Sequence, residues 1–232
     1  RGFGARRGHA HWNELVRGPE IDAVYVATPG DLHAPQTIAA AEAGRHVLCE
    51  KPMALTSQQC RAMIDACRAN GVRLGVAYYR HFYPVIHRIR EILAAGEIGR
   101  PGLAVIQAFE WYTIPEDSPR AWFFHRDRNG GGVMMDFGCH RIEVLLNLLG
   151  PVDEVRGVAG NTLFRREVED TATACFRFRS GPIGMLAVSV SVEEPHDTLD
   201  LYGSEGSLHV PVLNQGTLRV LHRGEERRES HP

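Results

Sequence analysis

With 232 residues, the chain is long enough for one large domain or two modest ones, each with a hydrophobic core. Hydrophobic residues make up 44% and charged residues 23%, as in ordinary globular proteins, and a formal net charge of −2 gives no reason to expect nucleic acid or an anionic membrane as a partner. No apolar run approaches the roughly 20 residues that cross a bilayer. The five cysteines are scattered without a CxxC pair, which favours free thiols in a reducing cytosol over a zinc site or a disulfide framework. We therefore expect a cytoplasmic protein.

The first 80 residues alternate between helices and apolar strands. The first two strands are continuous apolar runs, as expected of strands that are buried on both faces. Thr56 is suited to cap the last of the helices, and Gly44 is suited to end the one before it. The helices are predicted at 12–17, 34–43 and 57–70 and the strands at 23–27, 46–49 and 73–79. This alternation predicts parallel strands joined by right-handed crossovers.

The pattern changes after Tyr79. Apolar residues at helical spacing predict helices over 84–95 and 133–149, whereas 172–178 alternates in the manner of a half-buried strand. Further strands are predicted at 103–111, 183–192 and 198–202, and the charged run 224–230 is expected to be a solvated tail or turn. The predicted fold class is α/β plus α+β, with a partial Rossmann-type parallel sheet in residues 1–80. A domain with a large, mostly antiparallel open sheet is predicted to follow in residues 81–232.

Two strand ends carry polar residues to one edge of the predicted parallel sheet. The first strand stops at Thr28-Pro29-Gly30 and the second at Glu50-Lys51-Pro52. Ligands of open α/β sheets bind at this carboxyl edge. The proline restricts Lys51 to extended backbone, and the sequence does not decide whether the Lys51–Pro52 peptide bond is cis or trans. An ammonium held there can polarise an oxygen, although a solvated lysine at a strand end fits the spacing equally well.

A carboxylate and an imidazole form the second candidate. Asp136 and His140 lie four residues apart in a predicted helix, so they share one helix face. A carboxylate beside an imidazole orients the ring and raises its basicity, which suits a general base. Gly130–Gly132, just upstream, permits close approach of the backbone to a ligand. An ordinary surface pair has the same spacing, and no third residue with metal-type spacing stands out, so no metal site is predicted.

The turn after the first strand is the third candidate. Backbone amides and the hydroxyl of Thr28, with Pro29 and His33, could meet a phosphate or a ribose. The same residues also make an ordinary turn in which Asp31 caps the following helix. Among the remaining histidines, only His125, which follows an aromatic stretch, is a candidate for contacting a substrate.

Together these residues resemble the Gfo/Idh/MocA superfamily, named after glucose–fructose oxidoreductase and inositol dehydrogenase. The EKP tripeptide followed at long range by D-x-x-x-H is specific in combination. The similar strings occur in the family's order over most of Asp22–Gly150, with weaker similarity through DTLDLYGSEGSLHV; they are DAVYVATPGDLH, AGRHVLCEKPMALT, HFYPVIHRIREILAAGEIGRP and GGGVMMDFGCHRIEVLLNLLG.

The resemblance implies a two-domain enzyme that holds NAD or NADP in an N-terminal Rossmann domain. Its C-terminal domain would carry an open sheet, which in many relatives packs against a partner subunit. By the same resemblance, Lys51 would lie near the nicotinamide and the substrate hydroxyl, His140 would be the acid/base residue and Asp136 its partner. The residues that match the cofactor-contacting segments are Thr28, Pro29, His33, Glu50, Lys51 and Pro52.

Two positions and the start of the chain depart from the family's pattern. Gly30 replaces the commoner Asn, and Glu143 stands where the family often has Asp. The opening strand and its Gly-x-Gly-x-x-Gly loop have no match, since Gly2, Gly4 and Gly8 have the wrong spacing. We therefore expect a fragment of a longer protein that lacks roughly the first βαβ unit and the closing elements. Such a fragment would expose a sheet edge and apolar surface.

The resemblance thus implies an NAD(P)-dependent oxidoreductase that transfers hydride between a sugar-like or polyol hydroxyl and a nicotinamide cofactor. The implied partners are a small-molecule substrate and a second copy of the chain, bound through the C-terminal sheet. Neither nucleic acid nor a membrane is expected as a partner. Two alternatives stay open. One is a glycosidase of the same superfamily that uses NAD without net redox change. The other is a non-catalytic binding or assembly module.

Overall fold

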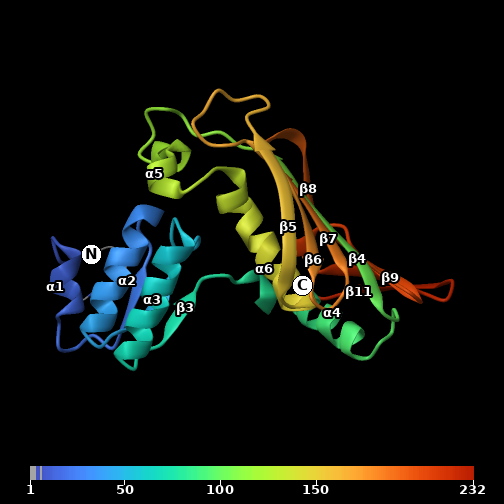
Figure 1. The fold of residues 1–232 in the computed structure, drawn as a ribbon, viewed down its shortest axis with the longest axis horizontal. Helices are drawn as coiled ribbons and strands as arrows, with labels where there is room; N and C mark the ends of the chain where they lie inside the picture. The colour runs from blue at the N-terminus through green and yellow to red at the C-terminus, as the bar shows by residue number, and fades with distance from the viewer. Residues whose placement is uncertain (1–3, 6) are drawn as a thin grey trace. The chain divides into compact units, whose positions relative to one another are not determined.

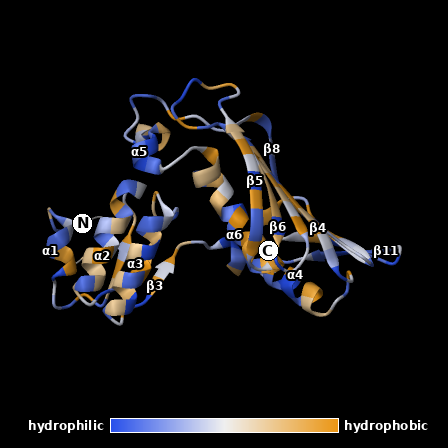
Figure 2. Ribbon diagram, viewed as in Figure 1, coloured by the Kyte–Doolittle hydropathy of each residue, from blue (hydrophilic) through white to orange (hydrophobic). Residues whose placement is uncertain are grey.

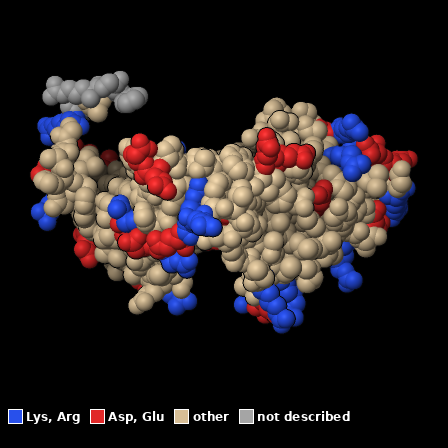
Figure 3. Space-filling model, turned by 90° about the horizontal axis from the view of Figure 1, so that it is seen from above, with Lys and Arg blue, Asp and Glu red and all other residues tan. Residues whose placement is uncertain are grey.

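The structure is a computed structural model that describes residues 4–5 and 7–232 (Figure 1). It divides into two compact units, Arg1–Ala77 with Asp127–Gly130, and Tyr78–Arg126 with Gly131–Pro232. Gly2, considered above as part of a nucleotide-binding loop, lies outside the described residues. Within the described part, no helix has both the length and the apolar character needed to cross a membrane. Charges of both signs are interspersed on the face seen in Figure 3, as the small net charge suggests.

The first unit contains a three-stranded sheet of order β1-β2-β3, in which both neighbouring pairs are parallel, as predicted. Thr56 caps the last helix as expected, because its Oγ1 accepts a hydrogen bond from the N–H of Gln59 at 3.2 Å. Gly44 ends the preceding helix with a φ of +76°. The elements are α1 (Trp12–Val16), β1 (Ala23–Val26), a 3₁₀ turn (Gly30–Leu32), α2 (His33–Glu42), β2 (His46–Cys49), α3 (Ser57–Ala69) and β3 (Leu74–Val76).

The prediction that the first two strands are buried on both faces is wrong. Val26 and Val47 are buried with the helices α2 and α3, whereas Tyr25 is 55% and Leu48 45% exposed on the other face. An apolar run is therefore no guarantee of two covered faces, because α2 and α3 pack on one side of the sheet.

The second unit contains an eight-stranded sheet of order β11-β10-β9-β8-β4-β7-β6-β5. All neighbours are antiparallel except β4 and β7, so the predicted fold class is confirmed. The strands are β4 (Pro101–Trp111), β5 (Val152–Gly160), β6 (Thr171–Phe178), β7 (Ile183–Ser189), β8 (Ser191–Gly203), β9 (Gly206–Val210), β10 (Thr217–His222) and β11 (Glu225–Ser230). The helices are α4 (Pro84–Ala94), a π-helical turn (Met134–Gly138) and α6 (Cys139–Leu149), with 3₁₀ turns at Arg80–Phe82, Ala121–Phe124 and Leu213–Gln215. The one-turn α5 (Arg126–Asn129) begins in this unit, but its last three residues belong to the first unit.

The core of the second unit lies between one face of this sheet and the helices α4 and α6 (Figure 2). Ile89 of α4 and Leu145 of α6 are almost fully buried against the sheet. Strand β6 alternates between buried and exposed residues as predicted. The opposite face exposes apolar side chains, including Val158 at 76% and Met185 at 44%.

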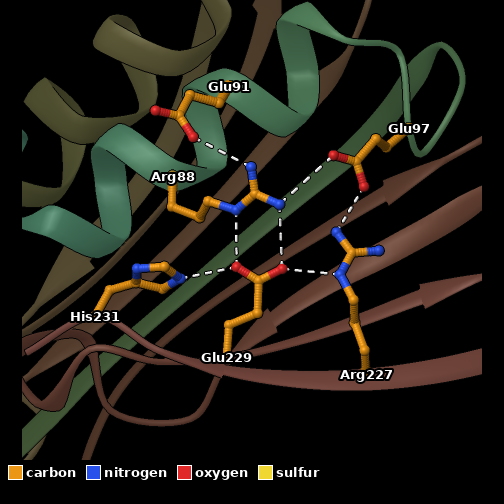
Figure 4. A network of polar contacts seen from close by, with 6 residues as sticks. All are labelled: Arg88, Glu91, Glu97, Arg227, Glu229 and His231. Atoms are coloured by element: carbon orange, nitrogen blue, oxygen red, sulfur yellow. Dashed lines mark hydrogen bonds and ion pairs between the residues drawn. The ribbon is translucent and has the colours of Figure 1, made fainter.

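The prediction that 224–230 is a solvated tail or turn is wrong, because Glu225–Ser230 forms the edge strand β11. Figure 4 shows why: the Glu229 carboxylate accepts hydrogen bonds from Arg88 Nε of α4 at 2.7 Å and from Arg227 Nε at 2.8 Å. His231 Nε2 lies 2.8 Å from the same carboxylate. The balanced charge of this run concealed partners that come from a distant helix.

Candidate active site

In the first unit, the side chain of His33 joins the two predicted strand ends. Its Nδ1 lies 2.8 Å from the carbonyl oxygen of Pro52, and its Nε2 lies 2.8 Å from that of Thr28. The side chain is 1% exposed. Both partners are acceptors, so a neutral ring donates to one carbonyl and an imidazolium to both. His33 thus holds the turn after β1 against the turn after β2.

The second strand end carries the predicted lysine. The Lys51–Pro52 peptide bond is cis, which the sequence left open. Glu50 Oε2 accepts a hydrogen bond from the backbone N–H of Lys51 at 3.1 Å, and the hydroxyl of Tyr25 on β1 also donates to the Glu50 carboxylate. This hydrogen bond raises the pKa of the Tyr25 phenol. The first unit therefore brings together all six residues predicted to contact a cofactor.

The turn after β1 differs from its prediction in one respect. Asp31 does not cap α2: the carboxylate lies inside the 3₁₀ turn, and its Oδ2 pairs with Arg128 Nε at 3.0 Å. A Cβ at Gly30 would lie 3.3 Å from the carbonyl oxygen of Arg128, so the lack of a side chain there makes room for residues 127–130. Thr28 Oγ1 donates to Gln36 Oε1 at 2.9 Å, which fixes the hydroxyl.

The residues at the two strand ends can be tested against the dinucleotide cofactor that the resemblance implies. The other oxygen of Asp31, Oδ1, is buried without a hydrogen-bond partner in the described structure, so it is available to a ribose or carboxamide donor. Lys51 supplies a cation from the neighbouring strand end. No described segment has the Gly-x-Gly-x-x-Gly spacing that approaches a pyrophosphate. The residues present therefore fit the nicotinamide half of the cofactor.

In the second unit, His140 lies in the first turn of α6 and is 5% exposed. The rings of Tyr78 and Tyr79 lie edge-on to its imidazole, with centroids 5.9 and 5.3 Å away. Asp136 lies in the π-helical turn just before α6. The single helix predicted over 133–149 is thus divided in two, and π-helical turns of this kind are frequent at functional sites.

The glycines before this turn allow a close approach, but to the protein's own chain. A Cβ at Gly132 would lie 1.9 Å from the carbonyl oxygen of Glu169. The same oxygen accepts a hydrogen bond from Val133 N at 3.1 Å, and Glu169 Oε1 accepts one from Met134 N at 3.2 Å. The segment before β6 therefore supports the start of the π-helical turn.

Sequence reasoning missed a buried ionic group beside His140. The Asp197 carboxylate on β8 pairs with Arg80 at 3.1 Å and with Arg141 at 2.8 Å. Arg141 directly follows His140 and shares a helix face with Val144 and Leu145, which are both buried. A charged residue on an apolar helix face is a signal that could have found it. Glu110 of β4 lies in the same field, and burial, followed by the charges of Asp136 and Asp197, raises the pKa of its carboxyl against the opposing effect of Arg141.

His125, the remaining candidate, is 60% exposed and lies 3.5 Å from the Glu167 carboxylate. It lines a cavity of about 620 Å³ together with aromatic and charged residues of two loops. Among the described residues, no group of three or more His, Cys, Asp or Glu is arranged to hold a metal ion.

Two family models match successive parts of the chain. Residues 3–78 match the model described as oxidoreductase family, NAD-binding Rossmann fold, and residues 86–209 match the one described as GFO/IDH/MocA C-terminal domain. The 1,5-anhydro-D-fructose reductase of Ensifer adhaerens is 36% identical over 84% of this chain and 58% of its own length. The scyllo-inositol 2-dehydrogenase (NAD(+)) of Bacillus subtilis is 30% identical over 90% of this chain and 60% of its own length.

Solved structures include a similar fold. Levoglucosan dehydrogenase, in complex with NADH and levoglucosan, matches with a TM-score of 0.91 at 26% identity, which covers 99% of this chain and 66% of that one. The chain thus spans between 58% and 66% of the length of these three relatives.

Proposed function

Because this chain belongs to the Gfo/Idh/MocA family of oxidoreductases, we propose that it acts as an NAD(P)-dependent oxidoreductase on a hydroxyl of a sugar-like or polyol substrate. Residues 1–80 would serve as the cofactor domain, and residues 81–232 as the substrate and oligomerisation domain. The relatives named above are, by their names, a reductase or dehydrogenases of an anhydro-sugar or an inositol, which supports a small polyhydroxylated substrate.

One observation carries the proposal. His33 ties the turn at Thr28 to the turn at Pro52, so the two strand ends form one polar edge on a parallel sheet. Ligands of this sheet type bind at that edge. The cofactor, when bound, supplies or accepts the hydride.

The chain's own residues would handle the proton and the charge. We propose that Lys51 and His140 meet at one substrate oxygen. There the imidazole would take the hydroxyl proton, and the ammonium would stabilise the developing alkoxide, a role worth roughly 3 kcal/mol per donor. Asp136 would fix the orientation of the ring. The rings of Tyr78 and Tyr79 restrict the imidazole from the side.

A second copy of the chain is the proposed partner of the open sheet face. On this face, Val158 of the outer strand β5 is 76% exposed and Met185 of β7 is 44% exposed. Apolar patches of this kind mark interaction sites. A cytoplasmic location stays a prediction from the sequence.

The test measures nicotinamide absorbance with NAD⁺ and NADP⁺ against levoglucosan and scyllo-inositol, and with NADH and NADPH against 1,5-anhydro-D-fructose. Lys51→Met and His140→Gln should each lower kcat about 10²- to 10⁴-fold and change cofactor affinity little. Arg68→Gln, at a side chain that is 78% exposed on α3, is the matched control and should behave as the parent protein.

Near-normal kcat in both variants would refute the roles of Lys51 and His140. Release of a sugar from a glycoside without net NADH formation would replace the proposal by the NAD-using glycosidase. No saturable binding of NADH to this chain would leave a non-catalytic module.

A further inference from the structure

Asp197 bridges two arginines from different parts of the second unit. Its Oδ1 accepts hydrogen bonds from Arg141 Nε at 3.1 Å and Nη2 at 2.8 Å, and its Oδ2 accepts one from Arg80 Nη1 at 3.1 Å. The side chains of Asp197, Arg80 and Arg141 are only 16%, 10% and 1% exposed. All three polar groups are thus withdrawn from water and depend on one another.

The side chain of Arg141 also contacts the π-helical turn. Its Nη1 donates to the carbonyl oxygen of Phe137 at 3.0 Å, and its guanidinium lies 3.9 Å from the centroid of the Phe137 ring. Phe137 follows Asp136 in the turn, and Arg141 follows His140 in α6. Through this side chain, Asp197 fixes the backbone on which both proposed acid/base residues lie.

Arg80 contacts the aromatic rings near the imidazole. Its guanidinium lies 5.8 Å from the ring centroid of Tyr79 and 5.9 Å from that of Tyr83. The Tyr79 ring in turn lies edge-on to His140 at 5.3 Å. Asp197 therefore acts on His140 by two routes, through the carbonyl of Phe137 and through the ring of Tyr79.

From this geometry we propose that Asp197 is the positioning residue of the acid/base site, which orients His140 and sets the charge around it through Arg80 and Arg141. This inference rests on the proposed function of His140. A buried carboxylate with two guanidiniums is weak evidence of added stability, because desolvation opposes the attraction between the charges. A gain in stability therefore does not explain why this buried carboxylate is present, whereas a positioning role does.

The charges of this group predict the direction in which each substitution shifts the titration of His140. One carboxylate against two guanidiniums leaves a net charge of +1 near His140, and removal of the carboxylate charge would leave +2. A larger positive charge disfavours an imidazolium, and a smaller one favours it. The titratable or charged groups that surround this region are Tyr78, Tyr79, Arg80, Tyr83, Glu110, Asp136, Arg141 and Asp197, together with the His81–Glu143 pair, in which Glu143 lies three residues after His140 in α6.

The experiment is an NMR titration of the His140 imidazole in the full chain without cofactor, with the resonance assigned by its loss in His140→Gln. Asp197→Asn should lower the titration midpoint by about 0.5 to 1 pH unit, and Arg80→Met, which leaves a neutral pair, should raise it by a similar amount. Asp200→Asn is the matched control: it lies on the same strand, but its carboxylate pairs with His209 at 2.6 Å. It should leave the midpoint of His140 unchanged.

Opposite shifts in the two variants support the positioning role, since a merely structural role gives no reason for opposite signs. If one variant fails to fold, the sign of the other decides. A midpoint unchanged within error in a folded variant overturns the proposal.

Activity separates this proposal from the function on which it rests. The acid limb of kcat/KM should move with the NMR midpoint, while the KM for the cofactor stays unchanged. If the midpoints shift as expected but no redox activity exists, the proposed function fails and the positioning by Asp197 stands. If redox activity exists but the midpoint does not shift, the proposed function stands and the positioning by Asp197 fails.

Discussion

Two carboxylates of the C-terminal sheet each receive two guanidiniums, yet they lie in different surroundings. Glu229 joins the edge strand β11 to α4, and its partners Arg88 and Arg227 are 27% and 40% exposed (Figure 4). Asp197 joins β8 to partners that are almost fully buried. The two carboxylates themselves are almost equally exposed, at 18% and 16%, so the difference lies in their partners: water reaches the arginines around Glu229 far more easily than those around Asp197.

The electrostatics follow the difference in burial. Hydrogen bonds from Arg88, and then from Arg227 and His231, lower the pKa of Glu229 to about 2, against the effect of burial. The pKa of Arg88 is raised in return, chiefly by Glu229. At the buried group the order is reversed: desolvation comes first and lowers the pKa of Arg141, with the charge of Asp197 opposing it. The exposed group thus fastens a strand, whereas the buried group holds a particular geometry.

The largest expected effect is on folding stability, and it tests the contrast in burial directly. Asp197→Ala leaves two buried guanidiniums without their carboxylate, so it should lower the free energy of unfolding by about 3–5 kcal/mol. Glu229→Ala should cost about 1–2 kcal/mol, because its partners can turn to water. Urea unfolding of both variants measures the two values. Equal losses would mean that burial does not distinguish the two groups.

A pH series sharpens the description of Glu229. Its carboxyl has a pKa of about 2 in the folded chain, against an ordinary 4.5, so the unfolded state binds the proton more tightly. The stability from this group is present above about pH 4.5 and is lost as the pH falls towards 2. After discounting for solvent screening, we expect about 1–2 kcal/mol. Glu229→Gln should remove that part of the pH dependence in urea unfolding, and an unchanged slope would contradict the pairing.

The smallest effect is expected at the outer arm of the same network. Arg227 is 40% exposed and contacts Glu97 and Glu229. Exposed ion pairs contribute little, so Arg227→Met should lower the free energy of unfolding by about 0.5 kcal/mol. A loss as large as that of Glu229→Ala would show instead that the network acts as one cooperative unit. Thermal unfolding monitored by circular dichroism is the appropriate measurement.

Much of the fold could be predicted because its signals are local. The cap at Thr56, the glycine that ends α2 and the alternation in β6 depend on neighbouring residues, and the structure has them where the sequence predicts them. The uncovered face at Tyr25 and Leu48 could not be predicted, since hydrophobicity does not tell which face has a partner.

Ionic partners are the clearest gap. Asp197 and Arg141 are 56 residues apart in the chain, and Arg88 and Glu229 are 141 apart. The balance of charges along the sequence does not reveal such pairs. The attraction depends on the distance between the two charges in the folded structure, and their separation along the chain does not give that distance. For the same reason the sequence of 224–230 predicts a solvated tail or turn, although Glu225–Ser230 is a paired strand.

By itself, the sequence determined which residues we propose for the chemistry: the lysine before a proline, the histidine that follows four residues after an aspartate, and the polar turn after the first strand. Periodicity and side-chain type are enough for that. Only the tertiary structure decided that His33 ties two strand ends together, that a π-helical turn interrupts the helix before His140, and that Asp197 lies behind it. These features depend on contacts between residues far apart in the chain, which form only when burial brings their elements together.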